Sequence, residues 1–154
     1  MQYIREMQED DENVGKVNKA NAEFYNAFEN LSIEIMDKMW KHDENIVCIH
    51  PGWDLFTGWL AIRESWITIF SNAEMIRFSI TNTKVRIFDN KIAVVVCLEN
   101  IETTLANGHA IKIGIIATNI FERNELNKWL LIHHHGSPIT NYIPPTYPLH
   151  SLIS

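Results

Sequence analysis

The chain has 154 residues, of which 46% are hydrophobic and 21% are charged, and its formal net charge is −6. Its length and composition are typical of one globular domain, and its negative charge argues against nucleic acid or anionic lipid as a partner, because both bind basic surfaces. No apolar stretch approaches the roughly 20 residues that span a bilayer, and no signal peptide is apparent, so we expect no membrane contact and a cytoplasmic location.

The N-terminal third of the chain predicts an acidic arm followed by a helix. Residues 1–15 carry much of the acidity and are expected to form a flexible, solvated arm. From Val14 to Lys41, apolar residues recur at three- and four-residue steps, which predicts one long amphipathic helix. This apolar stripe consists of Ala20, Phe24, Ala27, Phe28, Leu31, Ile35 and Met39.

A short strand and a second helix are predicted next. Residues 46–50 are an apolar run that Pro51 and Gly52 stop, as expected for a strand. Residues 59–70 return to a helical period, with Trp59, Ile62 and Trp66 on one face.

After Asn72 the period changes to two, which predicts long strands over 75–88, 91–103, 109–123 and 128–135. Turn residues separate the strands, and the last strand ends at residues 136–138. Residues 139–154 carry three prolines and are expected to form an extended tail. Helices followed by a meander of strands predict an α+β fold over residues 16–138, with helices on one face of an antiparallel sheet.

The strands over 91–103 and 109–123 are apolar on both faces. Strands of this kind are usually covered on both sides, and the helices can cover only one of them. A second copy of the chain is the simplest second cover, because large exposed apolar patches are unusual on monomers. We therefore predict a homodimer through the sheet face.

Three segments resemble a known family. They are residues 48–53 with 58–66, residues 117–123 and residues 129–138, and together they place the similarity over about residues 18–138. On these segments the chain resembles a SnoaL-like, or ketosteroid isomerase-like, member of the nuclear transport factor 2-like superfamily. The resemblance implies a cone-shaped α+β fold with a strongly curved sheet, frequent dimers and a small-molecule pocket between the helices and the sheet. It implies no single activity, because this fold carries enzymes, transport adaptors and association domains.

The isomerases of this superfamily use a catalytic aspartate with an oxyanion hole formed by a tyrosine and a protonated aspartic acid. Tyr25 lies one step from the best position of the apolar stripe, and no aspartate occurs inside the three long strands. Steroid-type isomerisation is therefore not the expected reaction.

Histidines are the first candidates for acid–base chemistry. His133 and His135 are two residues apart on a predicted strand and share a face with Trp129 and Leu131. Either one could be a proton shuttle in the pocket, because histidine titrates near neutral pH. The alternative is that both are core or interface histidines. His50 joins the candidates because the resemblance places its turn near the mouth of the pocket.

Glu99 is the second kind of candidate. It interrupts an apolar strand on the same face as Val95 and Cys97, and a carboxyl group in apolar surroundings has a raised pKa. Glu99 with a histidine would make an acid–base pair, and Asn119 on the neighbouring strand could bind one of these groups. Alternatively, the strand reaches solvent near Glu99.

Aromatic side chains are the expected walls of the pocket. Trp40, Trp53, Trp59 and Phe24 are candidates for contact with an apolar or planar ligand, with core packing as the alternative. We expect no cofactor, because the chain has no phosphate-binding glycine loop or dinucleotide motif. Two of the histidines with His50 could make a metal site, but no carboxylate stands at a fixed spacing, so we assign no metal.

Two functions remain open from the sequence. The first is a small-molecule pocket with cofactor-free acid–base chemistry of the isomerase, dehydratase or cyclase type, using His50, His133, His135 and Glu99. The second is a non-catalytic association domain that forms dimers through its sheet.

Overall fold

A computed structural model describes residues 1–104 and 107–146 of the chain. Its helices are α1 (Gln2–Glu29), α2 (Ile33–Met39) and α3 (Trp59–Asn72), and its strands are β1 (Val47–Ile49), β2 (Phe56–Thr57), β3 (Ile76–Phe88), β4 (Ile92–Thr104), β5 (Ala110–Arg123) and β6 (Trp129–Pro138). Within the described residues, no helix has the length and apolar character needed to cross a membrane.

The strands form one six-stranded sheet in the order β2-β1-β6-β5-β4-β3. All neighbours pair antiparallel except β1 and β6, which run parallel. The long strands β3 to β6 follow one another in the chain and lie side by side as a meander. Asp89 and Asn90 form the turn between β3 and β4 with positive φ angles of 52° and 51°, as a tight hairpin of this twist requires.

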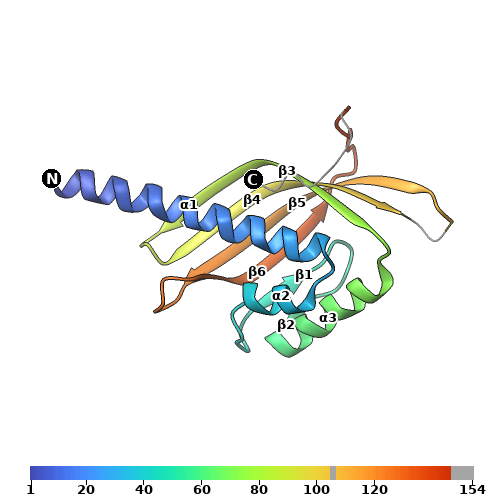
Figure 1. The fold of residues 1–154 in the computed structure, drawn as a ribbon, viewed down its shortest axis with the longest axis horizontal. Coiled ribbons are helices and arrows are strands. Elements are labelled where there is room, and N and C mark those ends of the chain that lie inside the picture. The colour runs from blue at the N-terminus through green and yellow to red at the C-terminus, as the bar shows by residue number, and fades with distance from the viewer. Residues whose placement is uncertain (105–106, 147–154) are drawn as a thin grey trace.

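The helices cover one face of the sheet, with α1 lying across it and α2 and α3 near β1 and β2 (Figure 1). The core lies between these layers and contains large aromatic side chains with almost no exposure, among them Phe24, Tyr25, Trp40, Trp66 and Phe78. The expected α+β fold, with N-terminal helices on a curved antiparallel sheet, is confirmed.

The first helix starts earlier and ends earlier than the periodicity predicted. It begins at Gln2, so most of the residues expected to form a flexible arm are helical, although Met1 to Glu12 are all exposed. Glutamate, glutamine, methionine and arginine are good helix formers, which explains a helix without burial.

The prediction of one helix from Val14 to Lys41 is wrong, because the chain breaks after Glu29. Leu31 has a φ of 52°, and the Ser32 Oγ accepts a hydrogen bond from the backbone N–H of Ile35 at 3.2 Å. Ser32 is therefore the N-cap of α2. The turn directs α2 across the end of α1 and towards β6.

Two irregularities bend the strands. In β3 the register with β4 shifts between Thr81 and Lys84. In β6 the partners of Ile120 and Phe121 are His133 and Leu131, so Ile132 is an extra residue. Bulges of this kind increase the local twist and change which side chains face each way.

The segment after β6 packs on the sheet face opposite the helices. The backbone N–H of Ile139 donates to the Gly114 carbonyl at 2.9 Å, and the Tyr142 hydroxyl donates to Asn100 Oδ1 at 2.7 Å. A Cβ atom at Gly114 would lie 2.1 Å from the Tyr142 ring. The glycine therefore makes room for the tyrosine, and the segment covers this part of the outer face.

Candidate functional site

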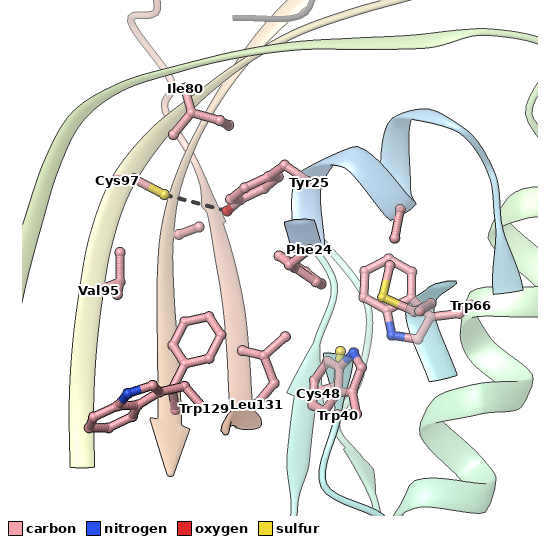
Figure 2. Packing of buried hydrophobic residues seen from close by; sticks show 14 of the residues in the cluster. Phe24, Tyr25, Trp40, Cys48, Trp66, Ile80, Val95, Cys97, Trp129 and Leu131 are labelled. Carbon is pink, nitrogen blue, oxygen red and sulfur yellow. Dashed lines mark hydrogen bonds between the residues drawn. The ribbon is translucent and has the colours of Figure 1, made fainter. Parts of the chain in front are cut away.

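A tyrosine and a glutamate meet in the core between α1 and β4. The Tyr25 hydroxyl donates to Glu99 Oε2 at 2.5 Å and lies 3.4 Å from Cys97 Sγ. Tyr25 is 0% exposed and Glu99 is 2% exposed. Figure 2 shows Tyr25 reaching from the helix towards Cys97 on the sheet. Glu99 thus shares the inner face with Cys97, as expected, and does not reach solvent.

A chain of hydrogen bonds extends from this pair across the sheet. Asn119 Nδ2 donates to the Tyr25 oxygen at 3.1 Å and to Asn21 Oδ1 at 2.9 Å. The side-chain oxygen of Asn119, Oδ1, can only accept a hydrogen bond. His134 Nδ1 lies 2.5 Å from it and therefore carries the proton and donates. The direction runs from His134 through Asn119 and Tyr25 to Glu99. The expected direct pair of Glu99 with a histidine is replaced by this longer chain.

Burial changes the titration of both members of the pair. Removal from solvent raises the pKa of Glu99 from 4.5 to about 7, although the hydrogen bond from Tyr25 lowers it. Removal from solvent and the nearby Glu99 charge raise the pKa of Tyr25 well above its ordinary value. Near neutral pH Glu99 can therefore either accept or release a proton, while Tyr25 stays protonated as a hydrogen-bond donor.

The predicted candidate His50 lies in a separate contact. Its Nε2 is 2.8 Å from Ser65 Oγ, which donates its own proton to the Ile62 carbonyl at 2.6 Å. The hydroxyl therefore accepts from His50, and the imidazole is not placed to take its proton. Burial lowers the pKa of His50 to about 4, so the ring is neutral near neutral pH. This geometry does not activate Ser65 as a nucleophile.

The prediction that His133 and His135 share a face with Trp129 and Leu131 is wrong. The extra residue Ile132 reverses the alternation, so His134 and Leu131 both face the core. His134 is 1% exposed, whereas His133 is half-buried and His135 is exposed. Burial lowers the pKa of His134 well below its ordinary value, and the neighbouring His50, His133 and His135 add to this effect.

The predicted aromatic walls divide into three groups. Phe24 adjoins the hydrogen-bonded chain, with ring centroids 4.9 Å from Tyr25 and 5.1 Å from His134. Trp40 and Trp59 are buried and stack on each other with centroids 6.1 Å apart. Trp53 is 44% exposed and packs on the edge of His50. Only Phe24 and the predicted Asn119 lie beside Glu99 and its partners.

Sequence reasoning missed Asn21 and His134, and it set Tyr25 aside because this residue lies one step from the best position of the apolar stripe. Residues 13, 17, 21 and 25 follow one another at four-residue steps, and all are buried. This spacing was visible in the sequence, but the buried stripe was assigned from apolar residues alone, so Asn13 and Asn21 were left out of it. His134 could be found only by placing the bulge.

The described cavities lie away from this chain of hydrogen bonds. One of about 780 Å³ is lined by residues 42–45 and 57–61, and one of about 400 Å³ lies between α1, α2 and the start of β6. Tyr25, Glu99, Asn119 and His134 line none of the cavities described. Within residues 1–104 and 107–146, no three His, Cys, Asp or Glu side chains converge as metal ligands.

Comparison with known proteins gives relatives in both sequence and structure. The F-box protein SKIP8 of Arabidopsis thaliana is 25% identical over 117 residues, which are 76% of this chain and 47% of that protein. The chain thus spans about half the length of this curated relative. A candidate dehydratase of the nuclear transport factor 2-like family from Streptomyces avermitilis is 30% identical with a TM-score of 0.78, over 84% of this chain and 98% of that one.

A candidate calcium/calmodulin-dependent protein kinase type II association domain from Thiobacillus denitrificans is 27% identical with a TM-score of 0.68, over 79% of this chain and 93% of that one. The model of the SnoaL-like domain family matches residues 17–141. The resemblance seen in the sequence is therefore confirmed, and the chain belongs to the SnoaL-like domain family of the nuclear transport factor 2-like superfamily.

Proposed function

We propose that the chain is a small-molecule-binding domain that performs cofactor-free acid–base chemistry on a compound with a carbonyl group, with Glu99 as the proton acceptor and donor. The observation that carries this proposal is the fully buried Tyr25–Glu99 hydrogen bond, which holds a carboxyl group with a pKa of about 7. Buried carboxyl groups that titrate near neutral pH are suited to move protons to and from carbon.

Each neighbour of Glu99 has a role in this proposal. His134 and Asn119 orient the Tyr25 oxygen through their hydrogen bonds, so the tyrosine proton points at Glu99. Asn21 Nδ2 is buried and has no oxygen or nitrogen acceptor among the described residues, and its neighbour is the Cys97 sulfur, a weak acceptor. A buried amide N–H with so weak a partner is costly, and a ligand carbonyl oxygen would be a better acceptor beside Tyr25.

The chemistry then needs only the groups of the chain. Glu99 as carboxylate removes a proton from the carbon next to the carbonyl, and the resulting enolate oxygen accepts from Asn21. Glu99 as carboxylic acid returns the proton to another carbon in an isomerisation, or to a departing hydroxide, which leaves as water in a dehydration. The description of the Streptomyces avermitilis relative as a candidate dehydratase agrees with this reaction class.

Access to Glu99 sets a condition on the ligand. Phe24, Phe78 and Ile80 are buried around the pair, and the cavities described do not reach it. Ligand binding therefore requires some of these side chains to move, which favours small and mainly apolar compounds.

Deuterium exchange tests the proposal without knowledge of the natural substrate. The protein is incubated in D₂O with a panel of small ketones, aldehydes and enones, and exchange next to the carbonyl is followed by proton NMR. We expect faster exchange than in buffer for at least one compound, and a loss of about 100-fold or more in Glu99→Gln, because general bases typically contribute factors of this order. Glu102→Gln, a half-exposed glutamate on the same strand, is the matched control and should keep the wild-type rate.

Exchange at the buffer rate for the whole panel, or exchange that Glu99→Gln leaves unchanged, would contradict the proposed chemistry. Tyr25→Phe separates the roles further. It should slow exchange less than Glu99→Gln does, because it removes an orienting hydrogen bond and leaves the carboxyl group.

A second function is favoured by the outer face of the sheet. Val94, Val96 and Leu98 of β4 are half-buried there, and Ile116 of β5 is 41% exposed. Partly exposed apolar side chains that gather on one sheet face are suited to association. The Thiobacillus denitrificans relative is described as a candidate association domain. A homodimer through the outer face would leave the Tyr25–Glu99 pair on the inner face free to act.

A further inference from the structure

A groove between α1, α2 and the turn that leads into β6 collects lysines in an otherwise acidic chain. We call it the lysine groove. Its volume is about 400 Å³, and it is lined by Lys16, Lys19, Ala20, Glu23, Lys38, Met39, Asn127, Lys128, Trp129 and Leu130. Four of its ten lining residues are lysines, although the chain as a whole has a net charge of −6.

These lysines are largely without counter-charges. Glu23 is the acidic residue of the lining, and its carboxylate lies 4.0 Å from Lys19 Nζ. Lys16, Lys38 and Lys128 have no carboxylate within ion-pairing distance in the part of the chain that the structure describes. They come from α1, α2 and the turn before β6, so the fold itself brings like charges together. An anion in the groove would relieve their mutual repulsion.

The floor of the groove adds an independent observation. Trp129 is 6% exposed, and its indole Nε1 has no hydrogen-bond partner among the described residues. The Arg123 guanidinium lies 6.0 Å from the centre of the Trp129 ring and adds a further positive charge nearby. A buried indole N–H without an acceptor is destabilising, so a ligand oxygen that reached Nε1 would supply a missing hydrogen bond.

The remaining lining is apolar. Ala20, Met39 and Leu130 line the groove with the Trp129 ring. Sites for small molecules typically combine an apolar surface with a few polar groups and have volumes of about 300–1,000 Å³. The lysine groove has this size, and four of its ten lining residues are apolar.

We propose that the lysine groove binds a small molecule with an apolar body and an anionic head group, either a carboxylate or a phosphate. Lys38 and Lys128 bind the head group, and Met39 and the Trp129 ring contact the body. The site is distinct from the Tyr25–Glu99 pair, none of whose members line the groove, so it does not depend on the proposed reaction.

Isothermal titration calorimetry with four probes tests the site. Octanoate and octyl phosphate carry both features, octanol carries only the apolar body, and inorganic phosphate carries only the charge. We expect saturable binding of octanoate, of octyl phosphate, or of both, and at least tenfold weaker binding of octanol and inorganic phosphate. The affinity should fall as salt is added, because exposed charges are screened. The comparison of the two amphiphiles identifies the preferred head group.

Paired charge variants locate the binding. The double variant Lys38→Gln with Lys128→Gln should weaken binding about tenfold, which corresponds to about 1.4 kcal/mol. The control, Lys84→Gln with Lys112→Gln, removes the same charge from exposed positions on β3 and β5 outside the groove and should leave the affinity unchanged. Trp129→Phe keeps an aromatic ring and removes the N–H, so it should also weaken binding.

Each of the following outcomes would overturn the proposal. No saturable binding of either amphiphile up to millimolar concentration would exclude the site. Equal binding of octanol, or equal weakening by the two double variants, would show that the lysines of the groove do not select the ligand. Weakening by Glu99→Gln without weakening by the groove variants would assign the ligand to the core instead. All four lysine positions are exposed, so these variants should fold as the wild type does.

Discussion

Folding changes the ionisation of the Glu99 carboxyl group, because it buries this group in the core. Its pKa is about 7 in the folded chain against an ordinary 4.5, because burial disfavours the carboxylate. Between these two values the folded chain binds more protons than the unfolded chain. The free energy of unfolding therefore falls as pH rises through this window, by at most about 3 kcal/mol from this group.

Glu99→Gln should remove this pH dependence, because glutamine does not titrate and its carbonyl still accepts from Tyr25. We expect the variant to gain stability relative to the wild type as pH rises from about 4.5 to 7, with a constant difference above that. Urea unfolding of both proteins at pH 5 and pH 8 measures the change, since contributions of other groups cancel in the comparison. An equal difference at the two pH values would contradict the raised pKa.

Tyr25→Phe gives a second measurement of the same group. The hydrogen bond from Tyr25 lowers the pKa of Glu99 in the folded chain, so its loss should extend the window of falling stability to higher pH, while the lower end of the window stays at the unfolded pKa. His50 and His134 act in the opposite sense at lower pH. Their lowered pKa values mean that the unfolded chain binds more protons as pH falls below about 6.5, and stability is lost there.

At the scale of elements, α1 and its break set the position of the polar residues in the core. The helix places Asn21 and Tyr25 on the sheet, and the turn after Glu29 allows α2 to cover β6. The first turns of α1 lie beyond the sheet and have no buried side chain before Asn13 (Figure 1). Their helical structure therefore depends on local propensity alone.

Gly15 and Gly52 make a matched pair that tests this part of the helix, because both have free space for a Cβ atom but only Gly52 has a positive φ. A Cβ atom at Gly15 or at Gly52 would meet nothing within 4 Å, but Gly52 has a φ of +79° and Gly15 lies within α1. Gly15→Ala should raise the free energy of unfolding by about 0.5–1 kcal/mol. Gly52→Ala should lower it by about 1 kcal/mol, because alanine disfavours positive φ.

Thermal and urea unfolding followed by circular dichroism would measure both variants. No gain in helix signal and no gain in stability for Gly15→Ala would indicate that the residues before it form a flexible arm in solution, as the acidic composition suggested.

The elements were predictable to different degrees, for physical reasons. Hydrophobic period and turn residues predicted β3 to β6 and their order, because each strand pattern is local. The break at Leu31 was missed, although Ser32 carries the cap that begins α2. The Tyr25–Glu99 contact was not predictable from local pattern, because its partners are 74 residues apart in the chain. Sequence reasoning did place Glu99 on an apolar strand face, which is the part of the site that depends on alternation alone.

At the scale of the whole molecule, the outer face of the sheet is only partly covered. Tyr142 packs over Gly114 and Asn100, and the apolar side chains of β4 and β5 beyond that point are only partly covered within the described chain. We expect a second copy to cover this remaining area in a two-fold dimer.

Sedimentation at micromolar concentration should therefore give twice the monomer mass of 17.9 kDa. Two residues of β5 with equal exposure make a matched pair, since Ile116 is 41% exposed on the outer face and Ile113 is 40% exposed on the opposite one. Ile116→Lys should shift the equilibrium towards monomer, because a charge would be buried in the interface, whereas Ile113→Lys should leave the dimer intact. A wild-type monomer, or equal effects of the two variants, would contradict a dimer through this face.

The extra residue in β6 has a consequence for how such interiors diverge. Because Ile132 has no partner on β5, loss of its codon would restore plain alternation and leave His134 opposite Asn119. Gain or loss of this one residue therefore changes the local twist of β6 without exchanging the polar side chain that faces the interior. Length changes at this point of the strand are thus an evolutionary route by which domains that share one scaffold reshape the cone while they keep its chemistry.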